Sequence, residues 1–81
     1  MEQQKKVVLF STPTCSWCTR TKRYFIQNQI RFTEVDVTRD KRAAQDIVRR
    51  TGQQGVPVIL IGSQAIVGFN KSRIDSLLGI N

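Results

Sequence analysis

Hydrophobic positions in the first part of the chain follow two kinds of pattern. The run Lys6–Phe10 is rich in β-branched and aromatic side chains and stops at Ser11-Thr12-Pro13, so it predicts a buried strand. Between Ser16 and Asn28 the larger side chains instead recur every three or four residues, as in an amphipathic helix. Arg31–Val37 alternates between polar and apolar positions and predicts a second strand. The predicted helix stripe comprises Trp17, Thr21, Tyr24 or Phe25, and Asn28.

A second helix is predicted after this strand. Thr38 is its expected N-cap, and Asp40 in the first turn and Arg49-Arg50 in the last turn complement the helix dipole. Gly52 suits the left-handed residue that commonly ends a helix. The apolar stripe of this helix consists of Ala43, Ala44, Ile47 and Val48.

The rest of the chain predicts a hairpin and a last helix. Two apolar strands, Pro57–Ile61 and Gln64–Val67, are separated by Gly62-Ser63, and a glycine in the first position of such a loop favours a type II′ turn. Asn70 is the expected N-cap of the last helix, which ends at Gly79.

These elements give the order β-α-β-α-β-β-α within a single domain of residues 1–81. The first three form a parallel βαβ unit, whose crossover is right-handed in nearly all proteins. The hairpin adds two antiparallel strands. We therefore predict an α/β fold with a mixed four-stranded sheet and helices on both faces.

The composition excludes several classes of function. Thirteen Lys and Arg against six Asp and Glu give a net charge of +7, and the chain has no histidine, which excludes His-based catalysis and His-ligated metal. The cations are scattered and few aromatics accompany them, which argues against specific nucleic-acid binding. No apolar run approaches the roughly 18–20 residues of a membrane span. A cytoplasmic protein with no membrane partner is therefore expected.

Two cysteines, in the run Cys15-Ser16-Trp17-Cys18, lie where the first strand ends and the first helix begins. A disulfide across so short a loop removes only about 1.9 kcal/mol of denatured-state entropy, which is little for a structural bridge. A zinc site needs four ligands, and this chain offers two cysteines and no histidine, so no metal is expected. Free N–H groups and the helix dipole favour a thiolate at a helix N-terminus. Arg20 and Lys22 add positive potential there, and Cys15 is the predicted nucleophile.

Cys18 lies one turn further into the helix, where it is more shielded. This asymmetry assigns the roles: Cys15 attacks a substrate disulfide, and Cys18 resolves the mixed disulfide. The product is a redox-active Cys15–Cys18 disulfide. The predicted activity is therefore that of a thiol–disulfide oxidoreductase with no tightly bound cofactor.

Three segments, T-P-T-C-S-W-C, G-V-P-V-I and G-F-N-K, resemble the glutaredoxin branch of the thioredoxin superfamily. The resemblance covers nearly the whole chain and implies a thioredoxin-like fold of the glutaredoxin type. It also implies a cis peptide bond before Pro57. In that geometry the backbone of Val56 is exposed beside Cys15, and an extended substrate segment can pair with it like an added strand.

Departures from the family pattern bear on the electron donor. Ser16 and Trp17 stand where most glutaredoxins have proline and tyrosine. Thr12 replaces a cation, and Phe69 replaces the second glycine of a Gly-Gly pair. Gly-Phe at this place is similar to the NrdH-redoxin type, which takes electrons from thioredoxin reductase. We therefore expect weak glutathione binding and favour thioredoxin reductase over glutathione as the donor.

The start of the last helix suits an anionic ligand group, because its amide N–H groups are unpaired. Motif and resemblance together predict a substrate-binding set made of Thr12, Trp17, Gln54, Val56, Pro57, Phe69, Asn70 and Lys71.

An alternative class is a dimeric iron–sulfur scaffold or carrier. Some glutaredoxins with C-S-Y-C bind a [2Fe–2S] cluster between two subunits, through the first cysteine and glutathione. Because Ser16 matches the serine of that motif, the resemblance implies the same role for Cys15 as an alternative. The favoured prediction is a monomer that reduces disulfide-containing proteins or low-molecular-weight disulfides.

Overall fold

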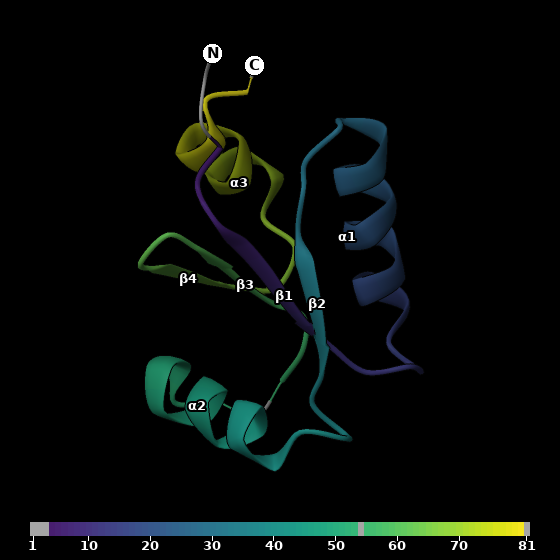
Figure 1. Ribbon diagram of the computed structural model, residues 1–81, viewed down its shortest axis with the longest axis vertical. Coiled ribbons are helices and arrows are strands. Elements are labelled where there is room, and N and C mark those ends of the chain that lie inside the picture. The colour runs from purple at the N-terminus through teal and green to yellow at the C-terminus, as the bar shows by residue number, and fades with distance from the viewer. Residues whose placement is uncertain (1–3, 54, 81) are drawn as a thin grey trace.

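The chain forms seven elements in the predicted order (Figure 1). The computed structural model describes residues 4–53 and 55–80. The strands are β1 (Val7–Ser11), β2 (Thr33–Asp36), β3 (Val58–Ile61) and β4 (Gln64–Val67). The helices are α1 (Ser16–Gln27), α2 (Lys41–Thr51) and α3 (Lys71–Leu78). Within the described ranges, no helix has the length and apolar character needed to cross a bilayer.

The four strands form one mixed sheet in the order β2-β1-β3-β4. β1 is parallel to β2 and antiparallel to β3, so Leu9 lies opposite both Glu34 and Ile59. β3 and β4 form the predicted hairpin, in which Gly62 has a φ of +59°, a conformation that favours glycine. The predicted mixed four-stranded sheet is confirmed.

The helices cover both faces of this sheet, with α1 and α3 on one face and α2 on the other (Figure 1). Leu9 of β1 enters a core with Phe25 of α1 and Ile74 of α3. The next residue, Phe10, belongs to the opposite core with Ile47 of α2. Alternation along β1 thus sets the two faces, and the end of this central strand leads directly into the turn before α1.

The predicted start of α2 is wrong. Asp40, and not Thr38, is the N-cap, and its carboxylate accepts the Ala43 N–H at 3.0 Å. Thr38 instead donates its N–H and its hydroxyl to Asp36, at 2.9 and 2.6 Å. This local turn occupies Thr38, so the helix begins two residues later than predicted.

Other element bounds and the buried stripe of α1 also differ from prediction. β2 is shorter than Arg31–Val37, because only Thr33–Asp36 pairs with β1. β1 itself begins and ends one residue later than predicted. Trp17 is 51% exposed and does not belong to the buried stripe of α1. That stripe is Cys18, Thr21 and Phe25.

Candidate active site

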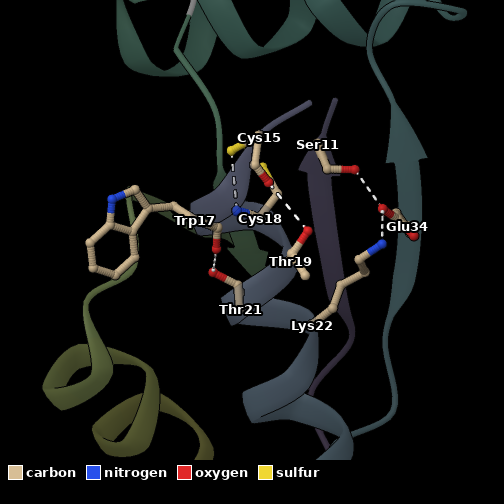
Figure 2. Close-up of polar contacts among 8 residues, drawn as sticks. All are labelled: Ser11, Cys15, Trp17, Cys18, Thr19, Thr21, Lys22 and Glu34. Carbon is tan, nitrogen blue, oxygen red and sulfur yellow. Dashed lines mark hydrogen bonds and ion pairs between the residues drawn. The ribbon is translucent and has the colours of Figure 1, made fainter. Parts of the chain in front are cut away.

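Cys15 is the N-cap of α1 and follows closely on the C-terminal end of β1. Its sulfur accepts a hydrogen bond from the Cys18 backbone N–H at 3.1 Å, as Ser, Asp or Asn oxygens commonly do at this position (Figure 2). The Cys15 N–H donates to the Thr12 carbonyl at 3.3 Å and closes the preceding turn. The sulfur therefore lies at the positive end of the helix dipole, where negative charge is stabilised.

The two thiols have very different surroundings. Cys18 is 1% exposed, Cys15 is partly accessible, and both cysteines are free. Burial, followed by the adjacent Cys15 sulfur, raises the pKa of Cys18 to about 12. Cys18 is therefore a shielded, protonated thiol at neutral pH. This asymmetry supports the predicted roles of Cys15 in attack and Cys18 in resolution.

Val56 and Pro57 form a shelf beside Cys15 although they lie far away in sequence. The Cys15 sulfur and the Val56 carbonyl oxygen are 3.9 Å apart, in a contact between residues 41 positions apart. The Val56–Pro57 peptide bond is cis, as the resemblance implies. The Pro57 carbonyl accepts the Gly68 N–H at 2.8 Å, which ties the shelf to the segment before α3. The tertiary fold thus brings the predicted shelf to the sulfur.

An aromatic cluster joins the dithiol motif to the segment before α3. The ring of Trp17 stacks on Phe69 with centroids 6.4 Å apart and an interplanar angle of 28°. The Arg20 guanidinium lies 4.8 Å from the Trp17 centroid, in a cation–π contact. Phe69 also packs edge-on against Tyr24 at 5.5 Å. Trp17 and Phe69 therefore form one apolar surface next to the dithiol, and the Arg20 guanidinium lies over its Trp17 ring.

Asn70 and Lys71 lie at the start of α3, as predicted, but each has a partner within the protein. The Asn70 side chain accepts the Arg73 N–H at 3.2 Å and caps the helix. The Lys71 ammonium pairs with Asp75 at 2.6 Å, and the Tyr24 hydroxyl donates to the same carboxylate. The Lys71 contact, followed by the Tyr24 hydrogen bond, lowers the pKa of Asp75. An anionic ligand at Lys71 therefore has to compete with Asp75.

The remaining predicted site residues have varied positions. Thr12 is partly buried and contacts Cys15 through its backbone. Lys22, predicted to stabilise the thiolate, pairs with Glu34 at 3.2 Å. Arg20, predicted to do the same, lies over Trp17. Gln54 lies outside the described residues.

Sequence reasoning missed a polar cluster beside the first two turns of α1 (Figure 2). The Ser11 hydroxyl donates to Glu34 at 2.7 Å, and the same carboxylate oxygen contacts Lys22. Ser11 is 1% exposed. Strand alternation places Glu34 at a polar position, but it carries no information about the Lys22 partner on another element. The cluster borders a cavity of about 320 Å³.

A βαβ unit, a dithiol at the strand-to-helix turn and a cis-proline shelf beside it define a dithiol protein of the thioredoxin fold. Within that class the glutaredoxin family model matches residues 7–66. The chain belongs to the glutaredoxin family. Membership and the Cys15–Cys18 pair together support thiol–disulfide oxidoreductase chemistry.

Two relatives illustrate the sequence similarity. The chain is 43% identical over 72 residues to an uncharacterized glutaredoxin-like 8.6 kDa protein in the rubredoxin operon of Clostridium pasteurianum, with 89% of this chain and 96% of that protein covered. It is 35% identical over 72 residues to glutaredoxin-1 of Mus musculus, with 82% and 67% covered.

Solved structures show the same fold. Methanoredoxin of Methanosarcina acetivorans matches with a TM-score of 0.86 and 26% identity, over 95% of this chain and 87% of that chain. A buckwheat glutaredoxin–glutathione complex matches with a TM-score of 0.70 and 28% identity, over 79% and 61%.

Proposed function

We propose that the protein reduces disulfide bonds in proteins or small molecules through Cys15 and Cys18. The observation that carries this proposal is the hydrogen bond from the Cys18 N–H to the Cys15 sulfur, beside a Cys18 thiol that is 1% exposed. An accessible sulfur at a helix N-terminus is a nucleophile, and a shielded thiol one turn away is positioned to resolve its product.

The proposed reaction consists of two successive thiol–disulfide exchanges. The Cys15 thiolate attacks one sulfur of a substrate disulfide, forms a mixed disulfide and releases the first substrate thiolate. Cys18 then loses its proton, attacks the Cys15 sulfur and releases the second substrate thiolate. The substrate gains two electrons, and the protein becomes the Cys15–Cys18 disulfide. The Val56 backbone offers a polar edge along which an extended substrate can align.

A trapping experiment tests the division of roles. Cys18→Ser should still attack and should accumulate a mixed disulfide on Cys15, because the resolving thiol is gone. Mass spectrometry after incubation with a disulfide-containing protein measures the adduct, and Cys15→Ser is the matched control that should form none. Faster labelling of Cys18 than of Cys15 by an alkylating reagent at neutral pH would contradict the assignment.

The electron donor in this proposal is a protein reductase such as thioredoxin reductase. Glutathione carries two carboxylates, whereas Lys71 is already paired with Asp75 and Asn70 already caps α3. Thr12 supplies no charge at the other end of the site. One missing charged contact weakens binding by about ten- to a hundredfold. The exposed ring of Trp17, stacked on Phe69, is instead suited to an apolar protein contact.

Side-by-side turnover assays decide between the two donors. One assay couples disulfide reduction to thioredoxin reductase and its nicotinamide cofactor, and the other uses glutathione with its own reductase. We expect turnover in the first assay and weak, unsaturated turnover in the second. Robust turnover with low glutathione and none with thioredoxin reductase would overturn the choice of donor but not the dithiol chemistry.

The iron–sulfur alternative stays a separate prediction with its own test. Anaerobic reconstitution with iron, sulfide and glutathione should leave a colourless monomer, measured by visible absorbance and size-exclusion chromatography. A coloured dimer that Cys15→Ser cannot form would favour the scaffold instead.

A further inference from the structure

The polar cluster of Ser11, Lys22 and Glu34 has no role in the chemistry described above, although it lies beside the dithiol motif (Figure 2). Its residues come from three different elements: the end of β1, the second turn of α1 and the middle of β2. Lys22 is four residues after Cys18 on α1, so the two side chains lie on the same stripe of the helix. The cluster therefore places a cation one helical turn from the resolving cysteine, and its carboxylate partner lies on β2.

Within this cluster Glu34 determines where the Lys22 charge is held. One oxygen of its carboxylate accepts the Ser11 hydroxyl at 2.7 Å and contacts the Lys22 ammonium at 3.2 Å. Ser11 is 1% exposed, so its hydroxyl contacts the Glu34 carboxylate from the interior of the protein. The Ser11 hydrogen bond, followed by Lys22, lowers the pKa of Glu34, so this carboxylate keeps its charge at neutral pH.

We propose that Glu34 is a positioning residue of the dithiol site, which binds the Lys22 ammonium and so leaves the buried Cys18 as a thiol while Cys15 attacks. The inference rests on the proposed function, because it concerns the step that Cys18 carries out. It also explains why a lysine expected to stabilise a thiolate is paired with a carboxylate instead.

The charged and titratable groups around Cys18 agree with this role. Cys15 adjoins Cys18 on the N-terminal side, and Lys22 follows one turn later on α1. From β2, the charge of Glu34 is among the causes that raise the pKa of Cys18, after burial and the Cys15 contact. Asp36 lies two residues further along β2, but Thr38 occupies its carboxylate. Glu34 is thus the carboxylate that links Lys22 to this site.

A two-phase reaction separates attack from resolution. Reduced protein is mixed with one equivalent of 5,5′-dithiobis(2-nitrobenzoate) in a stopped-flow instrument, and release of the coloured thionitrobenzoate is followed by absorbance. The first anion is released when Cys15 forms the mixed disulfide, and the second when Cys18 displaces the remaining aryl thiolate. The rate of the second phase is measured across neutral and alkaline pH.

Glu34→Gln removes the negative charge and frees Lys22. The second phase should become about two- to threefold faster at neutral pH, and its pH profile should move slightly to lower pH, because Glu34 is the smallest of the causes that raise the pKa of Cys18 and one pKa unit is a tenfold change in thiolate fraction. Lys22→Gln leaves Glu34 unneutralised and should move the profile the opposite way. Asp46→Asn on α2 is the matched control: it also raises the net charge by one, lies across the sheet, and should move neither phase.

The outcomes are distinguishable. A wild-type protein that shows no rapid first phase would overturn the proposed function itself. A normal first phase, with Glu34→Gln and Lys22→Gln both slowing the second phase at an unshifted pH profile, would mean that the cluster only holds α1 against the sheet. That result would overturn the inference. Urea unfolding of each variant shows that the comparison is made on folded protein, and if Glu34→Gln does not fold, the direction of the Lys22→Gln shift decides.

Discussion

α1 and α2 begin with the same hydrogen bond, made by different side chains. In α2 the Asp40 carboxylate accepts the N–H three residues ahead at 3.0 Å. In α1 the Cys15 sulfur accepts the N–H of Cys18, also three residues ahead, at 3.1 Å. The backbone before each helix is extended in both cases. A position that ordinarily stabilises a helix end therefore holds the sulfur of the proposed nucleophile at α1.

What differs is the environment of the two caps. Cys15 lies against the Val56 carbonyl and a buried second thiol, whereas Asp40 is exposed at the surface. Helix capping alone stabilises an anion at both places. Only the first place combines the cap with a partly accessible thiol, the Val56 carbonyl and a buried second thiol. The chemistry proposed for α1 thus depends on the choice of side chain and on the tertiary surroundings, because the cap geometry is the same in both helices.

The largest effect is expected at the cap of α1. Cys15→Ser should reduce disulfide reduction to the uncatalysed rate, because a serine hydroxyl at this position is not a thiol nucleophile. Serine is a good N-cap, so the free energy of unfolding should stay within about 0.5 kcal/mol of wild type. Turnover assays and urea unfolding measure the two quantities. Residual turnover above background would mean that another thiol reacts first.

The first turns of α3 extend the comparison, because a hydrogen bond joins them to α1. Tyr24 of α1 and Lys71 of α3 both bind Asp75, which is 8% exposed. Asp75→Ala should lower the free energy of unfolding by about 1–3 kcal/mol, since it leaves the Tyr24 hydroxyl without its acceptor. Urea unfolding measures the loss. Asp46→Ala removes surface ion pairs and should change stability little. Equal losses in both variants would mean that the contacts of Asp75 stabilise the fold no more than these surface ion pairs do.

A smaller effect is expected at the cap of α2. Asp40→Ala should cost about 1 kcal/mol of stability, within a range of 0.5–2, because the Ala43 N–H loses its partner. Disulfide turnover should be unchanged, in contrast to Cys15→Ser. Asp40→Ser, which keeps an oxygen cap, should restore most of the stability. A drop in turnover with Asp40→Ala would show that the α2 cap influences the dithiol site after all.

The smallest effect is a dependence on acid pH. Lys71, followed by Tyr24, lowers the pKa of Asp75 in the folded protein. A lowered pKa stabilises the fold above the unfolded pKa of about 3.9, and this contribution is lost as pH falls through the folded value. Asp75→Asn should therefore show a shallower loss of stability than wild type on acidification, in urea midpoints measured at successive pH values. Parallel pH curves for the two proteins would contradict this assignment.

Much of the fold was predictable because it depends on local periodicity. The apolar run at Val7–Phe10 and the spacing in α1 reflect which side chains must face a core, so the order of elements follows from the sequence. The start of α2 was not predictable in this way. Thr38 and Asp40 are both suitable N-caps, and the Asp36 contact that occupies Thr38 decided between them.

The candidate site likewise has one part that the sequence predicts and another part that it does not. The sequence alone places two cysteines at the start of a helix and predicts unequal roles for Cys15 and Cys18, because this prediction uses only neighbours within one helical turn. Tertiary packing, by contrast, pairs Lys22 with Glu34, and the folded α3 pairs Lys71 with Asp75, so that neither ammonium lies free for a ligand. A side chain four residues from a cysteine has several partners within reach. Which one it binds depends on the strand or helix that packing brings beside it, and such packing joins residues as distant as Tyr24 and Asp75, 51 positions apart.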